Sequence, residues 1–266
     1  MPAPVMHSEV ARVLGEEIVG GALPPGHVVN LAELAERFSR SRTVVREAVR
    51  VLESLGLVVS QRRVGVTVQP STAWSVLSPQ VIAWRLASDA REEQLRSLTQ
   101  LRQAVEPAAA RAAATLQQGD DGAGAGGETP ADGPAASSAA PDVGAAPGAE
   151  VDRAVTGLRE AAERLQALGQ RGEGDGEEYI EADVSFHVHL LRASGNEMFA
   201  ALESTISAVL RGRARLGRNP ARPTCRALDL HRELADAVDG GRPDAAETAS
   251  REILGGVLRD ISDPAS

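Results

Sequence analysis

Residues 31–52 carry the pattern that most constrains what this chain can fold into. Apolar side chains recur there at helical spacing in two short runs, with a polar turn between them. The apolar positions are Leu31, Leu34 and Ala35 in the first run and Val45, Ala48, Val49 and Leu52 in the second. The second run also carries Arg42, Arg46 and Arg50, four residues apart. Two short helices with a cationic stripe on the second predict a helix-turn-helix unit that inserts into DNA.

The charge of the chain is unevenly distributed. The formal net charge is −9, yet the stretch from Arg37 to Arg63 holds seven arginines against two acids, a local charge of +5. The arginines are Arg37, Arg40, Arg42, Arg46, Arg50, Arg62 and Arg63. A small basic head on an acidic body is typical of a sequence-selective binder of double-stranded DNA, whereas a nonspecific DNA coat would be basic throughout.

Several classes of protein are excluded by composition. The 28 basic residues are all arginine, and both a pyridoxal-phosphate Schiff base and a P-loop require a lysine. The single Cys225 can form neither an internal disulfide nor a cysteine-based zinc site, which indicates a reducing compartment. No stretch approaches the roughly 18 apolar residues of a membrane span, and the first residues lack the pattern of a signal peptide. We expect a cytoplasmic protein without a membrane partner.

The first 70 residues predict a winged helix-turn-helix domain. We expect a helix over 7–20, then a second helix capped by Asn30 with Glu33 answering it, then a third capped by Ser41. Two alternating runs, 57–60 and 64–68, predict a short hairpin. Three helices followed by a hairpin make up the expected domain, residues 1–70.

The rest of the chain predicts a linker helix and an all-α bundle. We expect a linker over 71–90, helical from Pro79, and an effector-binding and dimerisation domain over 91–266. The expected helices of that domain are 92–117, 152–170, 177–194, 196–216, 224–240 and 243–262. Residues 119–149 are almost all Gly, Ala, Pro, Ser and Asp, which predicts a disordered loop, with a partner-binding tail as the alternative. The expected fold class is mainly α.

Residues 16–68 resemble the N-terminal domain of GntR-family regulators. The resemblance is carried by Leu34-Ala35, Ser41-Arg42, VREA at 45–48 and LGL at 55–57. It implies that the start of the third helix faces the major groove, and we add the rest of its cationic stripe and the wing tip to the expected DNA contacts. The expected contacts are Ser41, Arg42, Thr43, Arg46, Arg50, Arg62, Arg63 and Gly65. The alternative is that the arginine stripe is only a solvated face.

Two positions depart from the family pattern. Ala32 stands where some members carry an arginine, and Ser39 stands where a glycine is usual in the turn. These departures bear on which operator is recognised.

The helical part resembles the FCD effector domain of the FadR-type branch of this family. The similar segments are LRQAVEPAAARAAA at 101–114, DVSFH at 183–187, ASGN at 193–196, LHRELADAV at 230–238 and DAAETA at 244–249. The resemblance implies a divalent metal, zinc or similar, held by Asp183, His187 and His231. The family's fourth ligand position falls on Ile253. The alternative is a buried hydrogen-bonded pair of Asp183 and His187 without metal.

Two further motifs are similar to the branch that contains the D-galactonate-responsive repressor: WxxLxPxVIxW at 74–84 and RxxVEPAAA at 102–110. This resemblance implies a small carboxylate effector such as a sugar acid. Arg102 would clamp the carboxylate, since a guanidinium offers it a planar fork, and Asn196 and Arg211 are further candidates. Alternatively, Arg102 pairs with Glu106 on a helix surface and Asn196 only caps a helix.

Together these features predict a homodimeric transcriptional regulator that binds an inverted repeat. A repressor is expected before an activator. We expect the segment between Trp74 and Trp84 to transmit effector binding to the head. A metal-dependent hydrolase using Asp183, His187 and His231 is the alternative from another class. It lacks the general-base carboxylate of an HExxH site and leaves the basic head unexplained. A β-rich sensor or an aminotransferase fused to the head is opposed by the scarcity of strands and the absence of lysine.

Overall fold

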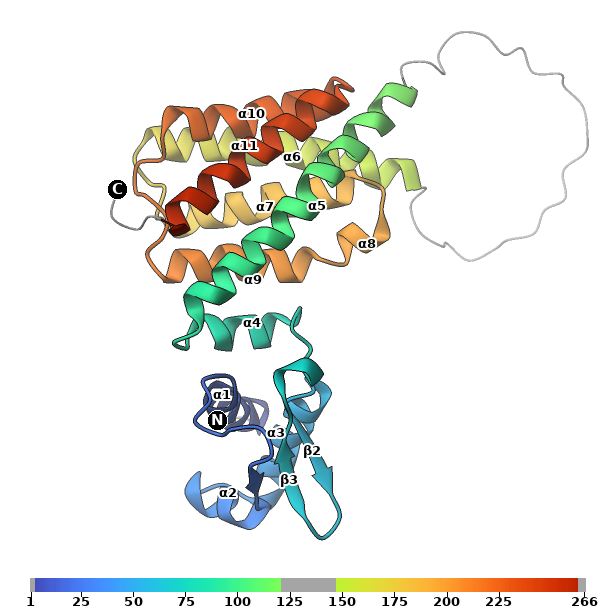
Figure 1. Ribbon diagram of the computed structural model, residues 1–266. Helices are drawn as coiled ribbons and strands as arrows, with labels where there is room; N and C mark the ends of the chain where they lie inside the picture. The colour runs from blue at the N-terminus through green and yellow to red at the C-terminus, as the bar shows by residue number, and fades with distance from the viewer. Residues whose placement is uncertain (1–2, 121–146, 263–266) are drawn as a thin grey trace, which may run out of the picture. The chain divides into compact units, whose positions relative to one another are not determined.

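The chain folds into two compact units, Met1–Leu98 and Thr99–Ser266. A computed structural model describes residues 3–120 and 147–262 (Figure 1). The units do not coincide with the expected domains, because the segment 71–90 falls inside the first unit. The fold class is mainly α, with a small sheet in the first unit, as the sequence predicted.

Helices of the first unit pack around a shared apolar core. They are α1 (Ala3–Val19), α2 (Leu31–Arg37), α3 (Arg42–Ser54) and α4 (Pro79–Leu86). Asn30 caps α2 by accepting from Ala32 N, and Ser41 caps α3 by accepting from Val44 N, as predicted. The apolar face of α3, whose members are Val45, Ala48, Val49 and Leu52, is buried in the core. Its arginines are thereby left on the opposite, solvent-facing side.

A three-stranded antiparallel sheet completes this unit, in the order β1-β3-β2. β2 (Val58–Gln61) and β3 (Gly65–Val68) form the expected hairpin, while the two-residue strand β1 (Val28–Val29) was not predicted. The left-handed backbone at Arg63 (φ 70°) and at Gly65 (φ 122°) makes the tight wing turn. Ser39, with φ 49°, is also left-handed. Its backbone conformation explains why a glycine is usual at this position of the turn.

α4 belongs to the core of the first unit and is no free linker. Val81 and Trp84 on α4 are buried with the side chains of α1 and α3. The approach of Trp84 to α1 is so close that a Cβ at Gly15 would lie 2.5 Å from the indole ring. Trp74 is fixed by a hydrogen bond from Nε1 to the Gln69 carbonyl. A short 3-10 turn, Ser71–Ala73, precedes α4.

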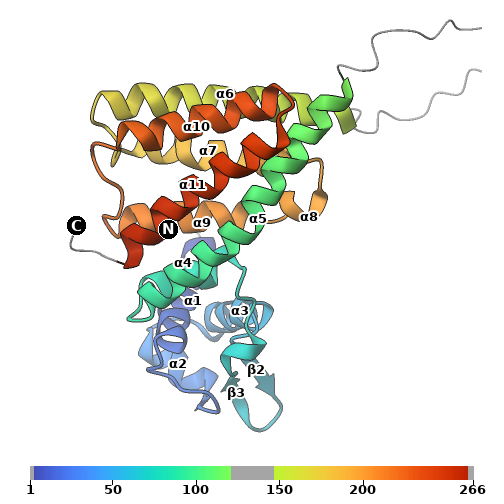
Figure 2. The ribbon, with the colours of Figure 1, turned by 45° about the horizontal axis from the view of Figure 1, so that its top comes forward.

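The second unit is all helical in its described residues. Its helices are α5 (Arg91–Asp120), α6 (Pro147–Gln170), α7 (Glu177–Ala193), α8 (Glu197–Ala200), α9 (Glu203–Arg215), α10 (Cys225–Asp239) and α11 (Pro243–Ser262). α5 begins in the first unit and continues into the second. α6 packs along α7 and α10, α10 packs along α11, and α7 packs along α9 (Figure 2). The bundle therefore encloses the inward faces of α7 and α10.

Two expectations for this unit need correction. The segment 196–216, expected as one helix, is divided into α8 and α9. Both ends of the segment 119–149, expected as a disordered loop, are helical, since α5 extends to Asp120 and α6 begins at Pro147. Residues 121–146 of that loop lie outside the described residues. Among the described helices, none is long and apolar enough to cross a membrane.

Candidate functional site

The exposed face of α3 carries the expected DNA-reading side chains. Ser41, Arg42, Thr43 and Arg46 are all exposed. Within the described residues, the side chains of Arg42 and Arg46 make no hydrogen bond or ion pair, so their guanidinium donors are available to a ligand. The N-terminus of α3 adds backbone N–H groups and the positive end of the helix dipole, which favour a phosphate.

Arg50 differs from the other two arginines of the stripe. Its Nη1 lies 2.7 Å from Glu47 Oε1, an i,i+3 ion pair on the helix surface. An acid therefore pairs with the C-terminal end of the stripe. Arg37 and Arg40 are also paired, with Glu17 and Glu9 on α1. Carboxylates thus offset part of the positive charge between Arg37 and Arg63, and fewer guanidinium groups are free of an acid than the count of arginines suggested.

At the wing, Arg62 and Arg63 are exposed and make no ion pair in the described part of the chain. Gly65 is partly buried behind them. A Cβ there would lie 3.0 Å from the Val29 carbonyl oxygen, and its φ of 122° disfavours any other residue. Gly65 therefore serves the wing by shaping its turn, with Arg62 and Arg63 as the charged groups at the tip.

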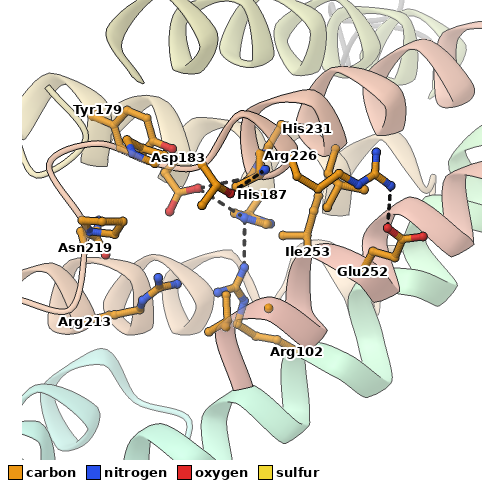
Figure 3. Close-up of a pocket in the computed structure, with 17 residues that line it drawn as sticks. Arg102, Tyr179, Asp183, His187, Arg213, Asn219, Arg226, His231, Glu252 and Ile253 are labelled. Atoms are coloured by element: carbon orange, nitrogen blue, oxygen red, sulfur yellow. Dashed lines mark hydrogen bonds and ion pairs between the residues drawn. The ribbon is translucent and has the colours of Figure 1, made fainter. Parts of the chain in front are cut away.

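A cavity of about 320 Å³ lies within the second unit, and it brings together residues from five of its helices (Figure 3). Arg102 comes from α5, Asp183 and His187 from α7, His231 from α10 and Ile253 from α11. Asp183 and His187 share one face of α7 because they are four residues apart. All the residues expected at the metal site, and the principal effector candidate, thus line one cavity.

Asp183, His187 and His231 form a compact group of possible metal ligands. Their ligand atoms all lie within 4.8 Å of one another. Asp183 Oδ1 is 3.5 Å from His187 Nε2 and 3.7 Å from His231 Nε2. Ile253 lines the same cavity and supplies no ligand. A set of three protein ligands with one open position is a workable arrangement for zinc.

The hydrogen bonds of His231 favour metal binding. Its Nδ1 lies 2.7 Å from the Ala227 carbonyl oxygen, and this contact requires a proton on Nδ1. Nε2 then carries a lone pair, and this buried atom has no hydrogen-bond partner among the described residues. An imidazole oriented in this way by a backbone carbonyl is typical of metal-ligating histidines. The residues present therefore fit a divalent metal.

Arg102 is bound to Glu106 inside the unit. Nε is 2.5 Å from Glu106 Oε1, and Nη2 is 3.3 Å from Oε2. Nη2 also lies 3.0 Å from His187 Nε2. The side chains of Arg102 and Glu106 are each only 1% exposed, so the alternative of a pair on the helix surface is corrected: the pair exists, but it is buried.

The charges of this cluster support one another. Burial opposes ionisation of Glu106, but Arg102 and His187 outweigh it and lower the pKa of Glu106 to about 2. Burial likewise opposes ionisation of Asp183, yet the hydrogen bond and charge of His187 hold its pKa below the ordinary value. Burial lowers the pKa of His231, so its neutral, ligating form is favoured.

His187 experiences opposing influences. Burial opposes its charged form, but the Glu106 carboxylate favours it, and the pKa of His187 is raised. The 3.0 Å contact with Arg102 Nη2 instead requires an unprotonated Nε2. Nε2 is therefore the unprotonated nitrogen of the ring, because a guanidinium has only donors and cannot accept a hydrogen bond from it.

Asn196 and Arg211, the other two effector candidates, do not line the cavity. Asn196 is exposed and caps α8, its Oδ1 accepting from Met198 N at 2.9 Å, which is the alternative weighed from the sequence. Arg211 is 40% exposed and pairs with Glu181 on α7 at 2.6 Å. Both side chains are thus engaged on the surface.

Sequence reasoning missed several cavity residues, among them Tyr179, Arg213 and Arg226. Tyr179 precedes Asp183 by four residues, so helical spacing could have placed it on the ligand face of α7. Arg226 forms an ion pair at 2.6 Å with Glu252, which also lines the cavity (Figure 3), and a second at 2.7 Å with Glu233. Nothing in the local sequence around Arg213 or Arg226 indicated the cavity.

Two family models match the chain in the expected order. The model described as bacterial regulatory proteins, gntR family, matches residues 6–68, and the FCD domain matches residues 133–256. The chain is a GntR-family regulator with an FCD domain. Both the family and its relatives are DNA-binding transcription regulators and not enzymes, which removes the hydrolase alternative. The FCD match includes Asp183, His187 and His231, while Arg102 lies outside it.

Relatives of this GntR regulator extend over nearly its whole length. It is 27% identical to the galactonate operon transcriptional repressor of Escherichia coli K12 over 258 residues, 96% of each chain. It is also 27% identical to the uncharacterized HTH-type transcriptional regulator YieP of the same organism, over 91% of this chain and 87% of the relative.

A solved structure shares the fold of the regulator. This is the structure described as "Lar controls the expression of the Listeria monocytogenes agr system and mediates virulence", which aligns with a TM-score of 0.56 at 14% identity over 97% of this chain and 96% of that one.

Proposed function

We propose that this regulator is a homodimeric repressor, released from its operator by a small carboxylate of the sugar-acid class. The relationship to the galactonate operon transcriptional repressor supports repression and this effector class. As a regulator of transcription it would act on the chromosome in the cytoplasm. Two copies of the head would address the halves of an inverted repeat.

On the DNA side, Arg42 and Arg46 are the proposed base readers, because a guanidinium binds guanine O6 and N7 with two parallel bonds. Ser41 and Thr43 would position the helix end in the groove. Arg50, whose charge is shared with Glu47, is better suited to a phosphate. Arg62 and Arg63 would contact the backbone from the wing, whose turn Gly65 allows.

The single observation that carries the effector proposal is the buried guanidinium of Arg102 at the wall of the cavity. A volume of about 320 Å³ suits a small molecule, at the lower end of the ~300–1,000 Å³ of ligand pockets. Arg102 would bind the carboxylate. The polar side chains of Tyr179, Asn219 and Thr224, also in the lining, would bind hydroxyl groups of a sugar acid.

We also propose a divalent metal, zinc or similar, at Asp183, His187 and His231. Such an ion would act as a Lewis acid toward a carboxylate or hydroxyl oxygen. His231 would be oriented by the Ala227 carbonyl. His187 has its Nδ1 2.8 Å from Glu106 Oε2, an ion-pair distance without hydrogen-bond geometry.

We place the transmission of the effector signal in α5. Trp84 is fixed in the core of the first unit, so the segment between Trp74 and Trp84 is a poor candidate for a moving part. α5 is continuous across the boundary at Leu98, and Arg102 follows that residue by one helical turn. To change operator binding, the effector must favour one of two arrangements of the DNA-binding heads over the other by a few kcal/mol.

The test combines DNA binding with ligand stabilisation. Fluorescence anisotropy would compare duplexes from the chain's own promoter region with random duplex at physiological salt. A specific fragment should bind at least roughly a thousandfold more tightly, and galactonate or a related sugar acid should release it. The same acids should raise the melting temperature, less so with chelator, since ligands bound only by the folded state stabilise it. Equal affinity for promoter and random duplex would refute the proposal.

A further inference from the structure

We propose that Arg102 competes with the metal for His187, so that a carboxylate effector and the metal each promote binding of the other. This inference rests on the function proposed above and adds a coupling device to it. The guanidinium has two alternative partners in the cavity, the His187 ring or an incoming anion. Only when the anion takes the guanidinium is His187 free to ligate.

The competition follows from one lone pair. Arg102 Nη2 lies 3.0 Å from His187 Nε2 (Figure 3), and a guanidinium can only donate, so Nε2 is the acceptor. The proton of the neutral ring is then on Nδ1, which lies 2.8 Å from Glu106 Oε2. Asp183 Oδ1 is 3.5 Å from the same Nε2, so a metal held with Asp183 would need that nitrogen. One ring nitrogen cannot serve both partners.

The missing fourth ligand makes the competition severe. Ile253 contributes only hydrocarbon to the cavity. The described residues offer three ligands: Asp183, His187 and His231. While Arg102 donates to His187 Nε2, only two of them can bind a metal. In addition, the positive guanidinium beside the site opposes the charge of a dication. We therefore expect weak metal binding in the absence of an anion.

A carboxylate can remove this obstacle without leaving Arg102 unpaired. Arg102 lines the cavity, and Glu106 holds its Nε at 2.5 Å, so the guanidinium stays near the cavity when Nη2 changes partner. A ligand carboxylate is a stronger acceptor for Nη2 than a neutral imidazole, because both groups are then charged. By linkage, the factor by which the anion raises metal affinity equals the factor by which the metal raises anion affinity.

The experiment measures zinc affinity of the full chain against a fluorescent chelator that also buffers free zinc, with and without galactonate. Wild type should bind zinc at least roughly tenfold more tightly with galactonate, the effect of losing one charged hydrogen bond. The variant R102M/E106Q removes both buried charges together and leaves an amide oxygen beside His187 Nδ1. It should bind zinc at least roughly tenfold more tightly than wild type without galactonate, and galactonate should raise its zinc affinity by a smaller factor than in wild type.

The matched control is R211M/E181Q, which removes an arginine–glutamate pair on the surface of the same unit. It should behave like wild type. If galactonate acted only by ligating zinc directly, wild type would still respond, but R102M/E106Q would gain no affinity. That result would overturn the competition, as would a wild-type zinc affinity independent of galactonate.

Failure of the metal site itself is distinguishable. Zinc affinity unchanged by His231→Ala would place the ion elsewhere and refute the proposed site, and the competition with it. A second readout needs no variant at Arg102. Cobalt(II) in place of zinc should give a visible absorption band that strengthens when galactonate is added to wild type at fixed cobalt, and an unchanged band would refute the coupling.

Discussion

Arginines in the two units of this regulator are placed in opposite surroundings. Arg42 and Arg46 on α3 are exposed and have no protein partner in the described residues, whereas Arg102 is buried with Glu106 and His187. An exposed guanidinium is stabilised by hydration and remains available to bind a polyanion from solution. A buried one must be compensated inside the protein, because an unpaired buried charge is costly. The same side chain therefore reads a macromolecule in one unit and responds to a small ligand in the other.

The largest effect should come from removing the compensation of Arg102. Glu106→Ala leaves a buried guanidinium without its carboxylate and should destabilise the second unit by roughly 3–5 kcal/mol. Both tryptophans, Trp74 and Trp84, lie in the first unit. Far-UV circular dichroism during urea unfolding therefore follows mainly the helical unit, while tryptophan fluorescence follows the head. We expect the dichroism midpoint to fall much further than the fluorescence midpoint.

Glu181→Ala is the matched control for this prediction. Glu181 pairs with Arg211, but the two side chains are 49% and 40% exposed. An exposed pair contributes about 0–1 kcal/mol, so both midpoints should stay close to wild type. Equal losses in Glu106→Ala and Glu181→Ala would contradict the distinction between buried and exposed pairs.

A smaller effect, on binding rather than stability, is expected in the head. Arg46→Ala removes a proposed base reader and should weaken specific operator binding by about 1–3 kcal/mol, roughly tenfold to a hundredfold. The fold should be unchanged, because Arg46 is exposed and has no ion-pair partner in the part of the chain that the structure describes. Fluorescence anisotropy with operator and random duplex measures both affinities, and the random duplex should lose far less.

Arg12→Ala controls for the loss of one positive charge from the first unit. Arg12 is on α1 and pairs with Glu16 at 2.8 Å. Its replacement should leave the preference for operator over random duplex intact. If Arg46→Ala also left that preference intact, the assignment of α3 as the reading helix would fall.

The head was predictable from sequence because its signals are local. The apolar face of α3, the caps at Asn30 and Ser41, and the hairpin each depend on residues close together in the chain. The strand β1 was not predicted because two residues are too few to show an alternating pattern. It is defined by its pairing with β3. α4 was expected to be a linker because nothing near Trp84 in the sequence indicates that it packs on Gly15.

The cavity was predictable only in part. The spacing of Asp183 and His187 and the family resemblance brought the three metal-ligand candidates together. The burial of Arg102 could not be predicted, since Arg102–Glu106 has the same i,i+4 spacing as the exposed Arg12–Glu16 pair. What separates the two pairs is tertiary: His187, from 85 residues further along the chain, approaches Arg102 from α7. Burial of this kind is decided by the packing of distant helices.

The smallest expected effect comes from the surface arginine that the sequence offered as an effector ligand. Arg211→Ala should leave the galactonate-induced rise in melting temperature unchanged, because Arg211 pairs with Glu181 on the surface and does not line the cavity. R102M/E106Q, in which the buried pair is replaced as a unit, should lose that rise. Differential scanning fluorimetry over a galactonate titration measures both. If Arg211→Ala lost the response and R102M/E106Q kept it, the effector would bind at the surface, and the contrast between the exposed and the buried arginines would have no functional meaning.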